Sequence, residues 1–461
     1  MMPGSPPFPM TAPAQPLPYA GSLRRVLSLP ALTLFGLVYM VPLTVFTTYG
    51  VVTQVTGGRT ALAYLLTLLS IFFTALSYSR MVGRYPVAGS AYSYARKSFG
   101  PMAGFLAGWS LLLDYLFLPM INYLVIGIYL HQSFPQVPAW GFIVTMIALV
   151  TVFNVLGIQS VSRFGNVLVA AQLVFVLVFV ALAARQIMTQ TSMDLLAPWQ
   201  GDGSAIGLAP VLAGAAILCL SFLGFDAVST LAEEAREPHR DIPRAIIITT
   251  IGAGLLFILL AAISQLAFPG SRFQHADSAA NEVMQRIAGP YFVSFFTASY
   301  VAGAFGSALA SQASVSRILY SMGRDRVLPH RVFAGLSQRF NTPIWSILMV
   351  SLCSLLALVM DLATLASLIS FGALVAFSVV NLAVIKTYLL DGKPHPFSAW
   401  LRYGLPAAIG FALTLWLWTS LSALTLQIGL AWLAAGVAYL LCLTRGLRKA
   451  VPTVQFDDSG S

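Results

Sequence analysis

The feature that most constrains this chain is a series of long apolar runs separated by short polar loops. A helix needs about 20 apolar residues to cross the hydrocarbon core of a bilayer. Twelve runs reach this length, so the sequence predicts an all-α integral membrane protein with twelve transmembrane helices. The predicted spans are residues 31–56, 60–82, 101–130, 138–157, 162–186, 206–235, 243–268, 286–322, 342–361, 363–386, 401–420 and 424–444.

The charged residues agree with this prediction and indicate an orientation. Only 9% of the 461 residues are charged, against roughly 25% in soluble domains. If the N-terminus is cytoplasmic, only four Lys and Arg residues lie on the outer side of the membrane, namely Arg59, Arg185, Arg272 and Arg286. The positive-inside rule therefore predicts that both termini are cytoplasmic. The net charge of +10 reports this topology and does not indicate nucleic-acid binding.

The two ends of the chain differ from the apolar domain between them. Residues 1–30 are rich in proline and contain no apolar block, which predicts a disordered cytoplasmic segment rather than a cleaved signal peptide. Residues 31–444 form the predicted transmembrane domain, and residues 445–461 form a cytoplasmic tail.

Two function classes are compatible with such a chain, a transporter and a membrane-embedded enzyme. The five histidines fall in predicted loops or at span ends, and the three cysteines lie far apart, so neither residue type predicts a metal or haem site. The sequence also lacks the glycine-rich phosphate loop of ATP-driven proteins. We therefore predict a secondary transporter, not an enzyme, without cofactor or metal and driven by an ion gradient or by exchange.

Two carboxylates lie well inside the predicted spans, Asp114 and Asp226, and no Lys or Arg lies deep in a span to pair with them. A carboxylate at this depth costs about 2.5 to 3.5 kcal/mol on insertion scales, so each is a candidate for function. The alternative is a protonated Asp that bonds a neighbouring serine or backbone carbonyl.

The surroundings of Asp114 favour a cation site. Ser110, Asp114 and Asn122 are spaced by four and eight residues, which places them on one helical face. Pro119 cannot donate a hydrogen bond, so the carbonyl of Tyr115 is free to accept one from a ligand. An ordinary proline kink is the alternative interpretation.

Spans 1 and 6 each contain a helix interruption. Pro42 precedes Thr44 in span 1, and Gly224 lies between Phe222 and Phe225 in span 6. The phenylalanines could cover a bound cation or could be core residues. Because spans 1 and 6 each begin a set of five, the pattern predicts an inverted repeat of residues 31–186 and 206–386, followed by two peripheral helices in residues 401–444.

Three segments resemble the amino acid/polyamine/organocation superfamily, in the order that the superfamily shows. They are RYPVAGSAYSYARKSFGPMAGFLAGW (84–109), SFLGFDAVSTLAEEAREPHRDIPRAI (221–246) and SVSRILYSMGRDRVLP (314–329). The resemblance extends from about Leu32 to the end of span 12. It implies a LeuT-like five-plus-five inverted repeat with broken helices 1 and 6.

The resemblance also implies a substrate class. Amino acid permeases of the superfamily carry a glycine-rich break in span 1 that holds a carboxylate, whereas this chain has VPLT (41–44). The segments LVYMVPLTVFTTYG, GWSLLLDYLFLPMIN, LCLSFLGFDAVSTL and ISFGALVAFSVVNL resemble the putrescine importers of the bacterial inner membrane. This implies substrate contacts at Asp114, Tyr115 and Asp226. The roles of Phe222, Phe225, Gly224 and Thr44 are predicted only from their place at the breaks.

Several alternatives remain at this stage. We favour proton symport, because a buried Asp can exchange a proton, over a sodium site built with Ser311, Ser314 and Ser316. The rival substrates are amino acids, taken up alone or exchanged, and a rival class is a sensor that binds without transporting. The loop 233–244 either gates the inner side through ion pairs or is an ordinary solvated loop.

Overall fold

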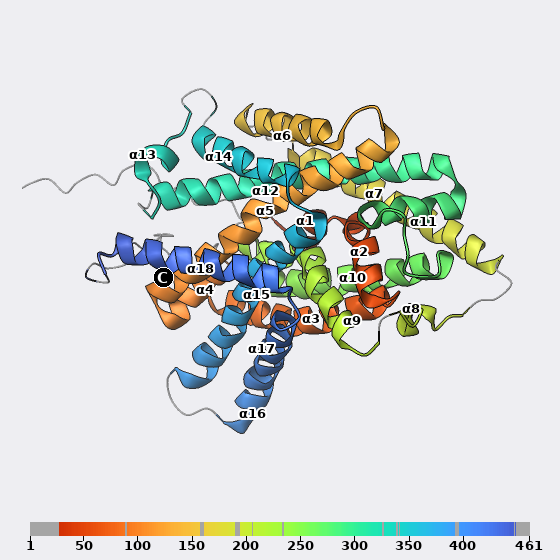
Figure 1. The fold of residues 1–461 in the computed structure, drawn as a ribbon. Helices are drawn as coiled ribbons and strands as arrows, with labels where there is room; N and C mark the ends of the chain where they lie inside the picture. Colours follow the sequence, from red (N-terminus) through yellow and green to blue (C-terminus); the bar gives the residue numbers. More distant parts are fainter. Residues whose placement is uncertain are drawn as a thin grey trace, which may run out of the picture.

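The computed structural model describes residues 27–87, 90–156, 161–189, 194–204, 206–232, 235–324, 327–337, 340, 342–391, 396–446 and 448. Within these residues the secondary structure is helical, with one isolated bridge between Leu27 and Ala235 and no strand. Figure 1 shows long helices packed side by side, with α6 at one edge and α16 and α17 at the opposite edge. Most of the predicted N-terminal segment and C-terminal tail lie outside the described residues.

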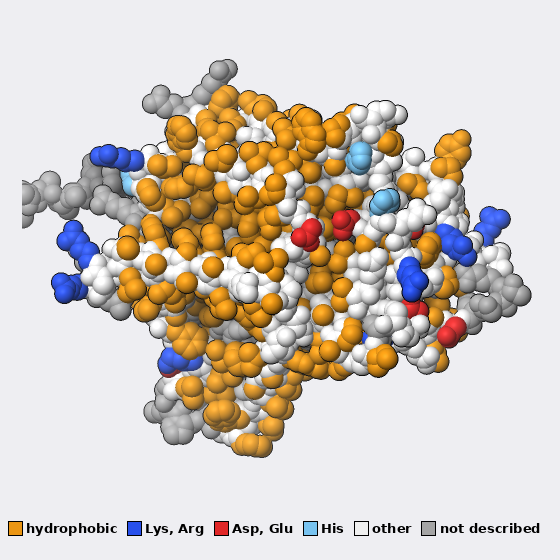
Figure 2. Space-filling view, in the orientation of Figure 1, with side chains coloured by type: hydrophobic (Ala, Val, Ile, Leu, Met, Phe, Trp, Pro, Cys, Tyr) orange, Lys and Arg blue, Asp and Glu red, His pale blue; other side chains and the backbone are white. Residues whose placement is uncertain are grey.

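Ten helices of the described chain are long and apolar enough to cross a membrane. In the space-filling view, apolar side chains cover the middle of the visible face and Lys and Arg side chains gather toward its two ends (Figure 2). This distribution suits a bilayer around the middle of the molecule. The all-helical membrane fold is thereby confirmed.

The uninterrupted helices of the first part of the chain follow the predicted spans closely. They are α3 (Thr60–Arg84), α5 (Pro101–Ser133), α6 (Ala139–Leu156) and α7 (Val161–Met188), with the short helix α4 (Ser90–Phe99) between α3 and α5. In the second part, α10 (Pro238–Ala267), α15 (Leu362–Ile385) and α18 (Ala423–Leu443) are similarly continuous.

The first predicted span is broken at the expected place. Helix α1 (Leu29–Met40) ends at Val41, a 3-10 turn covers Pro42–Phe46, and α2 (Tyr49–Thr56) completes the span. Val41 has φ 56°, a left-handed conformation that is strained for a β-branched residue. The Val38 carbonyl, to which Pro42 cannot donate, accepts a hydrogen bond from the Val41 N–H at 3.3 Å.

The sixth predicted span is also broken. Helix α9 (Ala209–Leu218) passes into a 3-10 turn (Cys219–Phe222), an extended Leu223 and a second 3-10 turn (Ala227–Leu231). Gly224 joins the two turns at φ 134°. A Cβ atom at Gly224 would lie 3.1 Å from both the Gly36 carbonyl oxygen and the Met40 nitrogen, so the break packs directly on the backbone of α1.

Some predicted boundaries were wrong. The span predicted to start at residue 286 starts at Pro290, because Gly289 at φ 76° separates α11 (Ala279–Ala288) from α12 (Pro290–Arg324). The span predicted from residue 243 begins earlier, since Pro243 lies within the first turns of α10. Two further apolar elements are short, namely α14 (Ile344–Ser354) with its 3-10 turn (Leu355–Leu358) and α17 (Leu405–Trp418) after a π-helical turn (Trp400–Gly404).

The last two helices pack on the outside of the bundle. Helix α17 contacts α3 and α15, and α18 contacts α5 and α15. Trp109 of α5 and Trp432 of α18 each donate an indole N–H to the other's backbone carbonyl at 2.9 Å. These reciprocal bonds fix α18 against the helix that carries Asp114.

A chain of polar side chains, buried at Tyr123 and Gln312, connects four helices. The Tyr123 hydroxyl of α5 donates to Gln312 Oε1 of α12 at 2.7 Å, and Gln312 Nε2 donates to Ser351 Oγ of α14 at 2.7 Å. Ser351 is in turn 2.6 Å from Thr151 Oγ1 of α6. Fully bonded networks of this kind make a bundle rigid, so these helices form a fixed frame beside the broken ones.

Replacing Gln312 by leucine is expected to destabilise this frame. The change leaves the buried Tyr123 hydroxyl without its acceptor, which costs about 1 to 3 kcal/mol, while the half-buried Ser351 keeps its bond to the Ile347 carbonyl. We expect a lower melting temperature in detergent for Gln312→Leu than for Ser294→Ala, whose hydroxyl is exposed and bonds only its own helix. Equal melting temperatures would show that the network contributes nothing to stability.

Candidate substrate site

The two helix breaks meet α5 and α12 around a small internal pocket. Its polar lining comes from Tyr39, Thr44 and Thr47 of the first span, Asn122 of α5 and Ser307 of α12. The free space inside it is about 20 Å³, which is room for about one water molecule. The surrounding helices must therefore move apart before an organic ligand enters.

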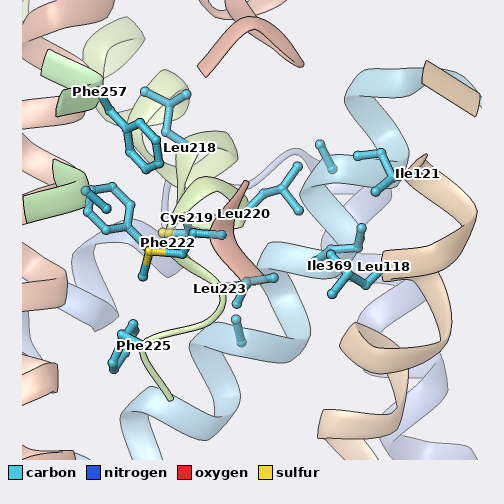
Figure 3. Packing of buried hydrophobic residues seen from close by; sticks show 14 of the residues in the cluster. Leu118, Ile121, Leu218, Cys219, Leu220, Phe222, Leu223, Phe225, Phe257 and Ile369 are labelled. Carbon is cyan, nitrogen blue, oxygen red and sulfur yellow. The ribbon is translucent and has the colours of Figure 1, made fainter. Parts of the chain in front are cut away.

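The apolar lining of this pocket comes from the second break and from α5. Leu220 and Leu223 extend toward Leu118 and Ile121, whereas the Phe222 and Phe225 side chains lie on the other side of the chain (Figure 3). The 3-10 geometry of Cys219–Phe222 and the extended Leu223 produce this division.

Asp114 lies on α5, one turn before the pocket-lining Leu118, and is 4% exposed. Gly372 of α15 packs against its backbone, since a Cβ there would lie 2.9 Å from the Asp114 nitrogen. The carboxylate forms no ion pair within the part of the chain that the structure describes. Asp226 is close enough to interact with it electrostatically, so the two carboxyl groups lie in one buried region.

Asp226 follows the second break and is also 4% exposed. Its Oδ1 accepts a hydrogen bond from the Gly224 N–H at 3.2 Å, so the carboxylate folds back over the break. The Ser229 hydroxyl donates to the Asp226 backbone carbonyl at 2.5 Å and secures the following turn. Two buried carboxylates without a cation repel each other, and a ligand that carries positive charge relieves this repulsion.

Two tyrosines belong to the same region. The Tyr39 hydroxyl is buried, has no hydrogen-bond partner among the described residues and interacts electrostatically with Asp114 and Asp226. Tyr115 is 8% exposed and interacts with the same two carboxylates and with Tyr39. Its carbonyl lacks the usual helical donor, because Pro119 lies within α5. Tyr39 escaped the sequence interpretation, since an aromatic residue at the end of an apolar run carries no distinctive signal.

The other predicted site residues are divided between pocket and core. Thr44 lines the pocket, and Gly224 forms the break that holds Asp226. Phe222 packs on Tyr64 and Phe257, at ring-centroid distances of 6.4 and 5.6 Å. Phe225 packs on Tyr78 and Phe377 at 5.4 and 5.3 Å, so neither phenylalanine faces the pocket.

The polar residues predicted to share one face of α5 also differ in their surroundings. Ser110 is buried and donates to the Leu106 carbonyl of its own helix at 2.7 Å. Asn122 lines the pocket and donates to Ser307 Oγ of α12 at 3.1 Å. Asn122 therefore links the pocket to α12, while Ser110 has a local role.

Gln172 of α7 is a second residue that the sequence interpretation missed. It is 2% exposed, and its Oε1 accepts a hydrogen bond from the Leu43 N–H in the first break at 3.4 Å. Gly303 of α12 gives it space, because a Cβ there would lie 2.4 Å from Gln172 Nε2. The sequence signal that could have identified Gln172 is a polar amide side chain within the apolar run of α7.

The remaining predicted groups lie away from the pocket. Ser311 donates to the Ser307 carbonyl at 2.7 Å, and the buried Ser316 hydroxyl has no partner among the described residues. Glu237, directly before α10, pairs with Arg240 of the first turn at 3.1 Å, with both side chains 59% exposed. Glu233 and Glu234 of the same predicted loop lie outside the described residues.

A helical membrane domain with two broken spans and buried charges between them defines a transporter that binds its substrate within the membrane. The chain belongs to the amino acid permease family, which it matches over residues 31–444.

Curated relatives cover nearly the whole chain. The low-affinity putrescine importer PlaP of Escherichia coli (strain K12) is 40% identical over 446 residues, which are 95% of this chain and 97% of PlaP. The branched-chain amino acid permease BcaP of Bacillus subtilis is 26% identical over 92% of this chain and 94% of BcaP. The methylthioribose transporter of Bacillus subtilis is 26% identical over 92% of this chain and 94% of the transporter. The predictions of a permease and of membership in this family are thereby confirmed, and the chain is a transporter and not an enzyme.

Proposed function

We propose that this chain imports putrescine, or a related diamine or polyamine, across the inner membrane of a bacterium. The observation that carries the proposal is the pair of buried carboxylates, Asp114 and Asp226, neither of which forms an ion pair with a described residue. A ligand with an ammonium group at each end supplies the two missing charges. The 40% identity to a putrescine importer supports the same substrate.

One ammonium group binds Asp114 in this proposal, together with the Tyr115 carbonyl and the Tyr39 hydroxyl. The other binds Asp226 beside Gly224. Thr44 lines the internal pocket together with Tyr39, and the Phe222 and Phe225 rings pack behind the second break. Desolvating two positive charges is costly unless each meets a partner, and this arrangement provides one for each.

The fold we propose for this activity has twelve spans in a five-plus-five inverted repeat. Counting α14 and α17 as spans, α3 packs on α10, α5 on α12 and α6 on α14, and the members of each pair are five spans apart. The two breaks are separated by five spans as well. With both termini cytoplasmic, rocking of the broken helices against the fixed frame opens the site to one side at a time.

Proton symport is the coupling that we favour. In this coupling, a buried carboxylate takes up a proton at the outer face as the diamine binds and releases it at the inner face as the diamine leaves, so that proton and substrate move inward together. A sodium site at Ser311, Ser314 and Ser316 is the alternative.

The test is uptake by the purified protein in proteoliposomes. We expect uptake of radiolabelled putrescine that is inhibited by longer diamines and not by leucine, and that stops when the proton gradient is collapsed. Inhibition by leucine would favour the amino acid permease activity of BcaP. Uptake that needs sodium would overturn proton coupling, and binding without uptake would indicate a sensor.

A further inference from the structure

A second group of buried hydroxyls lies on the α4 side of Asp226. Tyr78 of α3, together with Tyr94 and Ser90 of α4, is 0 to 3% exposed. None of the three hydroxyls has a partner among the described residues in normal hydrogen-bond geometry, although the Tyr78 hydroxyl lies near Ser90 and the Tyr94 hydroxyl lies near Ser229. An unpaired buried hydroxyl is costly, so three in one place call for a physical explanation.

These hydroxyls are close to the proposed substrate site. Tyr78 packs on Phe225, the residue before Asp226, at a ring-centroid distance of 5.4 Å, and the Tyr78 and Tyr94 centroids are 6.0 Å apart. Both tyrosines are close enough to Asp226 to interact with it electrostatically. Tyr78 lies beside Ser90 as well. The side chain of Tyr78 therefore connects Asp226 with the beginning of α4.

Aromatic rings surround the same place. Tyr78 contacts Phe225 and Phe377 at centroid distances of 5.4 and 6.1 Å, and Phe225 contacts Phe377 at 5.3 Å. The faces of aromatic rings attract ammonium groups. Ser90 has φ 47°, a left-handed conformation, so the backbone beside these rings is strained, as is common at functional sites.

An ammonium group has three N–H donors and no acceptor. Asp226 Oδ1 already accepts one hydrogen bond from Gly224, and the hydroxyl oxygens of Tyr78, Tyr94 and Ser90 have free lone pairs. We propose that these three hydroxyls and Asp226 form a second subsite for a primary ammonium group, which the substrate occupies as it leaves toward the α4 side. The proposal rests on the proposed function, because it requires an ammonium substrate.

The four rings are tightly packed, so the subsite opens when the broken helices move apart. With the proposed orientation, α4 lies at the cytoplasmic side, and the subsite is reached from there. In this proposal, the Phe225 ring contacts the ammonium group as the substrate leaves, at a place separate from the internal pocket.

The test compares substrate affinity at the two faces of the membrane in proteoliposomes of defined orientation. The variant is Tyr78→Phe with Tyr94→Phe, which keeps both rings and removes both hydroxyls. We expect the ratio of the putrescine KM at the α4 face to the KM at the opposite face to rise about tenfold, the effect of a hydrogen bond to a charged group. The melting temperature should change little, because neither hydroxyl is in normal hydrogen-bond geometry with a described residue.

Tyr123→Phe is the matched control, since its buried hydroxyl is bonded to Gln312 in the frame. It should lower the melting temperature and leave the KM ratio unchanged. An unchanged ratio in the double variant, or an equal change at both faces, would overturn the subsite. If the double variant does not fold, Ser90→Ala tests the same ratio. Absence of putrescine transport by the unmodified protein would instead overturn the proposed function.

Discussion

Asp114→Asn lowers putrescine affinity by at least about thirtyfold, which is the expected result if this carboxylate holds one end of the substrate. Removing one partner of a desolvated charge pair typically costs 2 to 5 kcal/mol, because the other charge remains without a counterion. Asparagine has nearly the same shape, so the change removes the charge and replaces one acceptor oxygen by an NH2 donor without opening a cavity. Equilibrium binding of radiolabelled putrescine to the purified protein measures the effect.

The stability of Asp114→Asn shows whether a loss of affinity comes from the missing carboxylate or from misfolding. A buried carboxylate without a cation is costly, so Asp114→Asn should be at least as stable in the absence of putrescine as the unmodified protein. Asp194→Asn is the control, because Asp194 is exposed in the loop before α8 (Ala197–Gln200) and bonds only the nearby Leu196 N–H. Retained affinity in Asp114→Asn, measured beside this control, would remove Asp114 from the site.

Gly224→Ala abolishes transport and lowers the melting temperature by several degrees. The backbone at φ 134° disfavours any side chain, and a strained conformation costs about 1 to 3 kcal/mol. The added Cβ would also lie 2.9 Å from the Met40 side chain and 3.1 Å from the Gly36 carbonyl oxygen. Relief of these contacts requires the two broken spans to separate at the place where Asp226 is held.

Gly252→Ala provides the matched control. This glycine lies in α10, and a Cβ there has no heavy atom within 4 Å. Alanine is favoured over glycine in a helix by about 1 kcal/mol, so this variant should keep transport and stability or gain stability. If Gly224→Ala behaves like Gly252→Ala in both assays, the break does not need glycine.

The helix breaks could be predicted from the sequence because their causes are local. Pro42 cannot donate to the helix, and Gly224 permits a backbone angle that other residues avoid. Asp114 and Asp226 could be found for a similar reason, since a carboxylate inside an apolar run stands out without any knowledge of the fold.

The directions of the side chains at the breaks could not be predicted. Phe222 and Phe225 are next to the second break in sequence, yet both point into aromatic clusters because the 3-10 turn and Leu223 rotate the chain. Tyr39 and Gln172 join the site only through contacts between distant elements. The interruption at Gly289, in contrast, had a local signal in the Gly289–Pro290 dipeptide, which the predicted span boundary overlooked.

The central claim is that two carboxylates hold the two ends of one diamine, and competition by n-butylamine tests it most directly. This amine has the chain of putrescine and only one ammonium group. In the unmodified protein, putrescine should compete for the site at least about tenfold better than n-butylamine, since a second charge pair is worth more than 1.4 kcal/mol. In Asp114→Asn the two amines should compete about equally. If putrescine keeps its full advantage in Asp114→Asn, the second ammonium is held elsewhere and the account is contradicted.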